Sequence, residues 1–238
     1  RGECAGMCRL KYNLLEDDRL VNNSDKYLLS PKDLCSVENF KELMNSNIYS
    51  FKIEGRMKSP AYVGIVTKIY RKLIDDYESG KELQVSQSDL DELKSIFYRG
   101  YTPGFLFNNE DIMNYDSSNH IGLYAGKITK VTPKKLAIKL DIDLKQGDSI
   151  RIKNINKGIT LNFIYDSKDN LIKSGTKGTT IYLDNFLNLT REDEIYLTSP
   201  KLPLETNITK KITVSMNFTA KLNEKIKLEV SDGINNIT

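Results

Sequence analysis

The sequence predicts an α/β region followed by an all-β region, and three observations lead to this assignment. Residues 1–118 alternate short apolar segments with long amphipathic ones, which is typical of βα units and a parallel sheet. Residues 119–200 carry short β-branched segments at roughly ten-residue spacing, which is typical of a small antiparallel β-barrel. Residues 201–238 are expected to be a linker and the truncated start of a further β unit.

The first βα unit is expected at YLLSPKDLCSVENFKELMNS. A strand over 27–29 leads into a helix with Ser30 as its N-cap and Pro31 at its first position. This pair favours a helix start, because the Ser side chain accepts from a free backbone N–H and Pro lacks one. Cys35 falls inside this helix and is expected to belong to the core.

The second βα unit pairs a strand over 48–54 with a helix that starts at Ser59 and ends at Gly80. Apolar residues recur at helical spacing along this helix and predict one broad buried stripe. The stripe is formed by Tyr62, Val66, Ile69 and Leu73, with Val63, Tyr70 and Ile74 beside them. A third helix is expected over 86–97.

Two βα units cannot close a parallel barrel, because a barrel of this type needs eight strands. We therefore expect residues 1–118 to be the C-terminal part of a TIM-type βα barrel, and the missing initiator Met fits a truncated chain. The incomplete sheet should leave an exposed edge over 27–54. That edge is expected to pair with a second copy or to be covered by residues 1–20.

Six β segments are expected in the second region, and their aromatic residues Tyr124, Phe163, Tyr165 and Tyr182 are expected to lie in its core. The segments cover residues 122–131, 134–142, 144–153, 158–166, 177–184 and 192–199. A hairpin-like unit follows over 210–233.

Composition excludes several classes of protein. No apolar run approaches the roughly 20 residues that span a bilayer, so no membrane partner is expected. Three cysteines in 238 residues do not make a disulfide scaffold, and reduced thiols in the cytoplasm are the expectation. Residues 1–120 hold 16 Lys and Arg against 19 Asp and Glu, whereas 121–238 hold 19 against 13. The basic second half either contacts phosphates or serves solubility.

The strand over 48–54 carries the clearest chemical signal. Alternation places Lys52 and Glu54 on the face opposite Phe51, and that face points into a βα barrel near the carboxyl end of the strand. Active sites of such barrels assemble at that end, with Arg56 in the turn beyond. Lys52, Glu54 and Arg56 are therefore the candidate catalytic residues. The alternative is an ion pair, Lys52–Glu54 or Glu54–Arg56, that only holds the barrel top together.

Two cysteines stand four residues apart at the start of the chain, in RGECAGMCR. Cys4 and Cys8 would share a face if this stretch were helical, and the flanking arginines would favour thiolates. As two of four ligands they suit an iron–sulfur cluster, whereas a free pair would be two inert thiols.

The patterns of known proteolytic sites are missing. The sequence contains neither a His-Glu-x-x-His nor a Gly-x-Ser-x-Gly motif. His120, the single histidine, would have to serve any Ser-His or Cys-His pair. Its place in NHIG at the junction of the two regions favours a capping or packing role.

Four stretches in this order resemble the C-terminal part of the collagenase-like peptidase family U32: RGECAGMCR, YLLSPKDLC, SFKIEGRMKSPAYV and IYRKLID. RGYTPGF, NHIG and the QGD turn are similar to longer members that carry added β domains. The resemblance implies a TIM-type catalytic domain and two further cysteines upstream of RGEC. Cys4 and Cys8 would then be half of the four ligands of a 4Fe–4S cluster, which is expected in the full-length parent and incomplete or absent in this fragment.

The resemblance also implies a choice of activities. Members are labelled peptidases with collagen as a reported substrate, but several support oxygen-independent hydroxylation of transfer RNA, ribosomal RNA or a quinone precursor. The leading hypothesis is a parent enzyme that hydroxylates a base of ribosomal or transfer RNA, with this fragment inactive by itself. The alternatives are a peptidase acting on peptides and a β module that binds RNA or protein without chemistry.

Overall fold

The computed structural model describes residues 4–21, 26–46, 48–55, 58–187, 189, 192–201, 212–222 and 224–238. The chain divides into two compact units, 1–201 and 202–238. The first unit contains three α-helices and a large antiparallel sheet, and the second contains a small three-stranded sheet.

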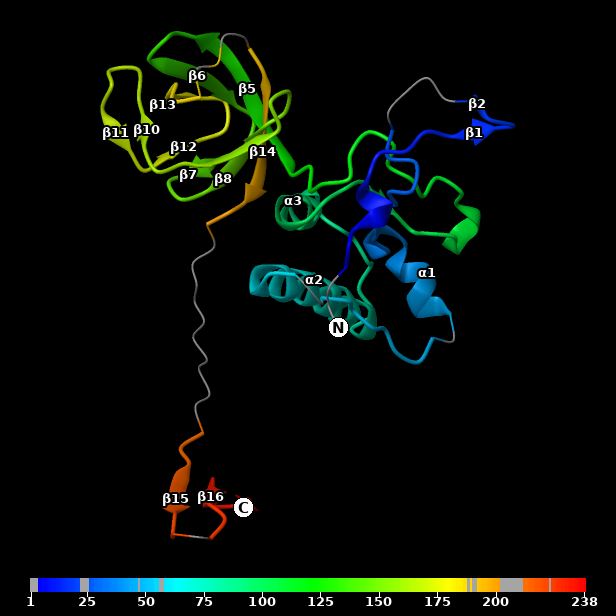
Figure 1. The fold of residues 1–238 in the computed structure, drawn as a ribbon, viewed down its shortest axis with the longest axis vertical. Helices are drawn as coiled ribbons and strands as arrows, with labels where there is room; N and C mark the ends of the chain where they lie inside the picture. The colour runs from blue at the N-terminus through cyan, green and yellow to red at the C-terminus, as the bar shows by residue number, and fades with distance from the viewer. Residues whose placement is uncertain are drawn as a thin grey trace. The chain divides into compact units, whose positions relative to one another are not determined.

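The first part of unit 1 consists of helices and short strands joined by irregular segments (Figure 1). β3 pairs in parallel with β4, through Asp33 with Tyr101 and Leu34 with Thr102. The elements are η1 (Met7–Arg9), β1 (Leu15–Glu16), β2 (Arg19–Leu20), β3 (Asp33–Leu34), η2 (Val37–Asn39), α1 (Phe40–Asn45), α2 (Pro60–Glu78), α3 (Gln87–Ile96), β4 (Tyr101–Thr102) and η3 (Leu106–Asn108).

The strands expected over 27–29 and 48–54 are not formed. An extended segment becomes a strand only when a neighbour takes up its N–H and C=O groups, and the described residues offer 48–54 no such neighbour. Within the described part of the chain, parallel pairing is limited to β3 and β4. The TIM-type barrel stays a prediction. Near the expected edge, Tyr12 bridges to Lys26, and pairing with a second copy stays a prediction.

The first helix begins later than its sequence signal indicates. Ser30 is fully buried and caps no helix, and α1 begins only at Phe40. Asp33 and Cys35 are instead held in extended backbone by hydrogen bonds from their N–H groups to Gly100 and Thr102. These long-range bonds override the local Ser-Pro signal, and Cys35 lies outside any helix.

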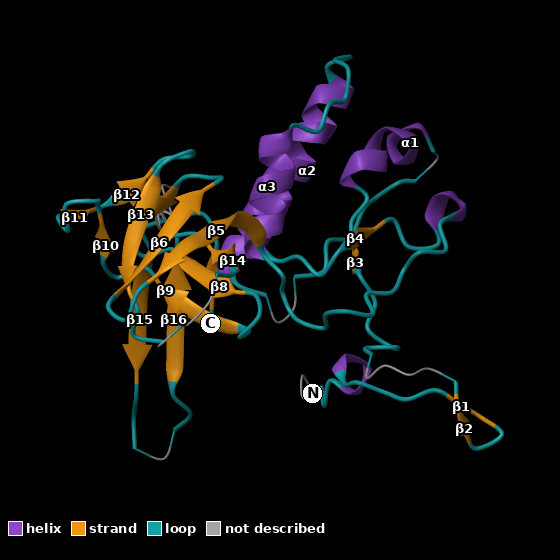
Figure 2. Ribbon diagram, turned by 90° about the horizontal axis from the view of Figure 1, so that it is seen from above, coloured by secondary structure: helices purple, strands orange, loops and turns teal. Residues whose placement is uncertain are grey.

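The second and third helices form as predicted and pack side by side (Figure 2). Ser59 caps α2 by accepting from the Tyr62 N–H at 3.2 Å, and Gly80 ends the helix with a φ of 73°. Ser86 and Asp89 form a reciprocal capping box on α3. The buried side of α2 consists of Ile65, Val66, Ile69 and Leu73.

The second part of unit 1 is an eight-stranded antiparallel sheet that curls around one hydrophobic core (Figure 1). The strand order is β11-β10-β13-β6-β5-β14-β8-β9, and β7 pairs separately with β12. The strands are β5 (Leu123–Val131), β6 (Lys135–Leu140), β7 (Leu144–Lys145), β8 (Ser149–Ile152), β9 (Lys157–Thr160), β10 (Ile164–Tyr165), β11 (Leu171–Ile172), β12 (Ser174–Gly175), β13 (Thr180–Asp184) and β14 (Glu194–Ser199).

Aliphatic side chains alone fill the centre of this sheet. The buried cluster consists of Ala125, Ile128, Leu136, Ile138, Leu140, Leu144, Ile150, Ile152, Leu161, Ile164, Ile181, Leu183, Ile195 and Leu197. The expectation that Tyr124, Phe163, Tyr165 and Tyr182 belong to the core is wrong. Each directly adjoins a buried aliphatic residue in sequence, so strand alternation turns its ring outward, and Phe163 is 59% exposed.

Unit 2 contains the predicted hairpin. β15 (Ser215–Thr219) pairs with β16 (Lys227–Ser231), and β17 (Asn236–Ile237) adds to the other edge of β16. Most of the expected linker, 202–205, lies outside the described residues. In the part of the chain that the structure describes, no helix combines the length and the apolar character needed to cross a membrane.

Candidate functional site: a cysteine turn beside a cationic cluster

The two N-terminal cysteines lie on a tight turn and not on one helical face. Gly6 adopts left-handed backbone with a φ of 65°, and η1 begins only after it. The Cys4 sulfur accepts from the Gly6 N–H at 3.4 Å. Cys4 and Cys8 are both exposed free thiols. This cysteine turn, residues 4–8, presents two accessible thiols, and the condition for a shared helical face is not met because Cys4 lies outside η1.

Arg9 fastens the cysteine turn to the body of unit 1. Its Nη1 donates to the Ser30 hydroxyl oxygen at 2.7 Å and to the Pro31 carbonyl oxygen at 2.8 Å. Ser30 is completely buried and also reaches the Ser117 carbonyl at 3.4 Å. Burial, with repulsion from Arg99, lowers the pKa of Arg9. This half-buried arginine anchor fixes where the adjoining thiols lie.

Asp33 and Arg99 form a largely buried ion pair next to this anchor. Arg99 donates from Nε and Nη2 to one carboxylate oxygen of Asp33, at 3.0 and 2.5 Å, and its backbone N–H donates to the other oxygen at 2.8 Å. The two side chains are only 17% and 15% exposed. Such two-pronged pairing is geometrically specific, and it holds β3 against the chain that enters β4.

Lys58 adds a third cation to this group. Its Nζ lies over the Phe97 ring, 2.8 Å from the centroid, and the Arg99 guanidinium lies 4.9 Å from the same centroid. Burial lowers the pKa of Lys58 to about 8; Arg99 and Arg9 act in the same direction, and Asp33 opposes them. The Asp33 carboxylate pairs directly with Arg99 and acts electrostatically on Lys58 and Arg9, and we call these four residues the cationic cluster.

His120 also packs on Phe97. The two rings stack with centroids 5.4 Å apart and planes 17° apart. The His120 Nδ1 accepts from the Tyr98 N–H at 2.9 Å, and its Nε2 lies 3.0 Å from the Thr198 carbonyl oxygen, to which it donates. Burial lowers the pKa of His120. Both ring nitrogens are engaged with backbone, so His120 packs as predicted and is not free to act as a general base.

The predicted catalytic residues do not point into a closed site. Lys52 and Glu54 form an ion pair at 2.9 Å, and their side chains are 85% and 70% exposed. The expectation that both are buried on an inward strand face is therefore wrong, because 48–54 is not part of a sheet. Arg56 lies outside the described residues. A catalytic role for the three residues stays a prediction.

Cys35 differs from the other two cysteines. It is partly buried, and burial raises the pKa of its thiol, with weaker opposing contributions from hydrogen bonds. Together with Tyr62, Tyr70 and Tyr101, Cys35 lines a small cavity. A thiol held neutral in this way is a poor metal ligand.

Sequence reasoning missed Lys58 and Arg99 as site residues. Both stand in stretches with a family resemblance, SFKIEGRMKS and RGYTPGF, but neither stretch shows by itself that the two meet. The signal that could have found them is chemical: two cations placed beside aromatic residues, at Lys58 before Tyr62 and at Arg99 after Phe97.

The donor set of the cysteine turn matches an iron–sulfur cluster in kind but not in number. Thiolates are the ligands that such clusters take, and four are needed. Cys4 and Cys8 supply two, and the described residues contain no group of three or more His, Cys, Asp or Glu side chains that could hold a metal ion. The described part of the chain therefore does not make a complete cluster site by itself.

The first half of the chain is similar to a known protein family. Residues 1–115, which carry the cysteine turn and the cationic cluster, match the model of Peptidase family U32. The match covers the part of the chain that carries the motifs, and the resemblance inferred from them is confirmed.

Three curated relatives show the range of names within this similarity. The 23S rRNA 5-hydroxycytidine C2501 synthase of Escherichia coli is 34% identical over 160 residues, 64% of this chain and 24% of that protein. A collagenase of Porphyromonas gingivalis is 28% identical over 206 residues, 82% of this chain and 57% of that protein. The tRNA hydroxylation protein P of Haemophilus influenzae is 33% identical over 148 residues, 57% of this chain and 31% of that protein. The chain thus spans from about a quarter to somewhat over half of these relatives.

Proposed function

We propose that this protein takes part in hydroxylating a base of ribosomal or transfer RNA, as an iron–sulfur-dependent enzyme of family U32. The observation that carries the proposal is the cysteine turn, which Arg9 anchors near Lys58 and the Arg99–Asp33 ion pair. Relatives named for rRNA and tRNA hydroxylation support the same substrate class.

The cysteine turn and the cationic cluster have different roles in this proposal. Cys4 and Cys8 contribute two of the four thiolates that would hold the iron–sulfur cluster, and the iron–sulfur cluster would supply electron transfer. Arg9 keeps the turn in place through its bonds to Ser30 and Pro31. Lys58 and Arg99 attract an anionic group of a substrate or co-substrate to the cysteine turn, because their joint charge exceeds that of Asp33.

Lys52, Glu54 and Arg56 are retained as candidate substrate contacts. The exposed Lys52–Glu54 pair contributes little to stability, since both groups stay in water. Substituting it therefore reports on substrate contacts and not on folding.

Iron binding tests the proposal directly. The full-length protein is reconstituted anaerobically with iron and sulfide, and bound iron and visible absorbance are measured for the natural full-length protein and for its Cys4→Ser, Cys8→Ser and Cys35→Ser variants. We expect the first two substitutions to reduce bound iron and the third, at a partly buried thiol, to leave it unchanged. Equal iron in all four proteins, or none in the natural protein, would count against the proposal.

A peptidase is the second candidate, because the relatives named collagenase match over 82% of this chain, at 28% and 27% identity. The chemistry of His120 argues against a peptidase. Both ring nitrogens of this single histidine bond to backbone groups, so it cannot serve a Ser or Cys nucleophile. Cleavage of gelatin by highly purified protein, lost on Glu54→Gln, would favour this candidate over RNA hydroxylation.

A further inference from the structure

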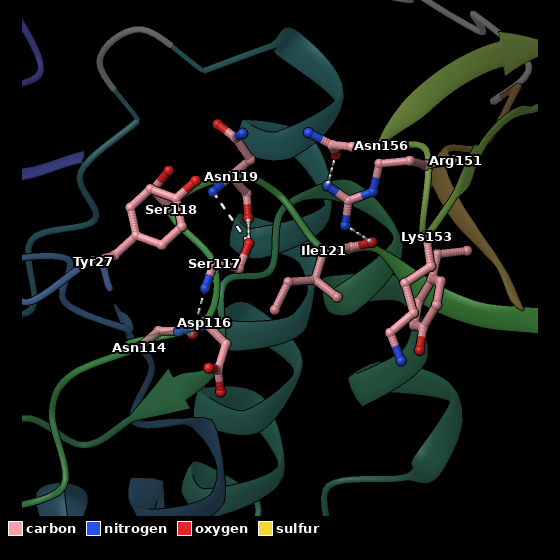
Figure 3. A pocket seen from close by; sticks show the side chains of 11 residues that line it. Tyr27, Asn114, Asp116, Ser117, Ser118, Asn119, Ile121, Arg151, Lys153 and Asn156 are labelled. Carbon is pink, nitrogen blue, oxygen red and sulfur yellow. Dashed lines mark hydrogen bonds between the residues drawn. The ribbon is translucent and has the colours of Figure 1, made fainter. Parts of the chain in front are cut away.

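We infer that a polar groove around Arg151 binds single-stranded RNA through one backbone phosphate, an inference that takes its ligand class from the proposed function. The groove has a volume of about 510 Å³ and lies between the 114–121 segment and strands β8 and β14 (Figure 3). Its chemistry is carried by Arg151, Lys153, Tyr27, Tyr196 and the Ser and Asn residues of that segment.

Arg151 is the unusual feature of the groove. Its Nη2 donates to the Ile121 carbonyl at 2.7 Å, and its Nη1 lies 3.4 Å from the Asn156 side-chain oxygen (Figure 3). Its Nε is buried and finds no hydrogen-bond partner among the residues that the structure describes. Among the described residues no carboxylate pairs with it, and burial lowers its pKa. Removing a guanidinium from water without a counter-ion costs free energy, and a bound anion would offset that cost.

The other charges of the groove are already paired. Lys153 bonds to Glu194 at 2.9 Å, and the same carboxylate oxygen accepts from the Tyr196 hydroxyl at 2.8 Å. Asp116 is neutralised by Lys26 at 2.5 Å. Arg151 therefore leaves the groove with one uncompensated positive charge. Arginine suits this task, because its planar fork matches the oxygens of a phosphate group.

The groove walls carry the remaining elements of RNA recognition. Tyr27 and Tyr196 contribute two aromatic rings, and stacking on such rings is how bases of single strands are held without sequence preference. Ser118 and Asn119 add polar groups in the same wall (Figure 3). Hydroxyl and amide groups are suitable partners for the ribose 2′-OH, which distinguishes RNA from DNA. One cation, two rings and a polar wall favour a nucleotide strand over an apolar or acidic peptide.

Fluorescence anisotropy with a labelled uridine RNA of about twelve nucleotides tests this inference, since single-strand sites span about 4–16 nucleotides. The proteins compared are the natural chain, Arg151→Met, Tyr27→Leu and the control Lys173→Met, which removes an exposed lysine outside the groove. We expect about tenfold weaker binding for Arg151→Met, because a charged hydrogen bond is lost. The salt dependence should also fall by about 0.7 in log–log slope between 50 and 200 mM salt.

Each remaining outcome decides the matter. Tyr27→Leu removes a ring without touching Arg151, so weakened binding by this variant supports the groove even where Arg151→Met fails to fold. Equal affinity for the natural protein, Arg151→Met and Tyr27→Leu overturns the inference, as does displacement of the RNA by poly-glutamate at equal charge concentration. The binding assay needs neither an iron–sulfur cluster nor turnover. RNA binding by a protein that takes up no iron on reconstitution would therefore contradict the proposed function but not the RNA groove.

Discussion

Replacing His120 with Ala should destabilise unit 1, because it removes two hydrogen bonds and one ring-stacking contact. The ring accepts from Tyr98, donates to Thr198 and stacks on Phe97. Each hydrogen bond contributes about 1 kcal/mol net, and an aromatic pair about 0.5–1.5 kcal/mol beyond its buried area. The expected loss is therefore about 3 kcal/mol. For a unit of this length that loss corresponds to a melting temperature lower by about 9 °C.

The same variant should also change how stability depends on pH. Burial depresses the pKa of His120 in the folded state, so the unfolded chain binds the proton more readily. Stability from the neutral ring is then complete above the unfolded pKa of about 6.5 and is lost as pH falls through the lower folded pKa. His120→Ala lacks this group, so its stability should fall less steeply on acidification.

Urea unfolding followed by far-UV circular dichroism measures both effects, which suits a chain without tryptophan. Asn119→Ala is the matched control, since Asn119 is an exposed neighbour that bonds only through its backbone within the described part of the chain. A loss under about 1 kcal/mol for His120→Ala, or an unchanged pH profile, would refute the reasoning.

Three further outcomes are expected. Asp33→Asn removes the partner of a largely buried Arg99 and should cost about 3 kcal/mol in urea unfolding; a cost under 1 kcal/mol would show that the pair is not structural. Amine labelling followed by peptide mass spectrometry should give Lys58 a midpoint near pH 8, and a midpoint above pH 10 would contradict its burial. Ser59→Ala removes the acceptor of the Tyr62 N–H and should cost about 1 kcal/mol, whereas no change would mean that packing alone fixes the start of α2.

Signals that act within a few residues predicted the fold well. Ser59 caps its helix as expected, because a cap needs only the next turn of backbone. Strands of the second region follow their β-branched segments where the adjacent segment supplies the partner, as in the pairs β5–β6 and β8–β9. The strand over 48–54 was wrong because a strand depends on a partner elsewhere in the chain, which the segment itself does not encode.

The candidate site was predicted only in part. The cysteine turn and the packing role of His120 were visible as residue types in particular places. The cationic cluster was not, because Arg9, Lys58 and Arg99 come from three distant segments that meet around Asp33 and Phe97. Arg151 was hidden within an alternating strand pattern, which indicates the face of a residue but not whether a carboxylate faces it.

Nucleoside mass spectrometry of ribosomal and transfer RNA tests the central claim most directly. RNA is compared from cells that carry the natural gene, a deletion, or a deletion complemented with the natural, Cys4→Ser/Cys8→Ser or Cys35→Ser protein. The account predicts that one nucleoside loses a single oxygen atom on deletion, and that the natural and Cys35→Ser proteins restore it while the double variant does not. Identical nucleosides in the deleted and natural cells would contradict the account.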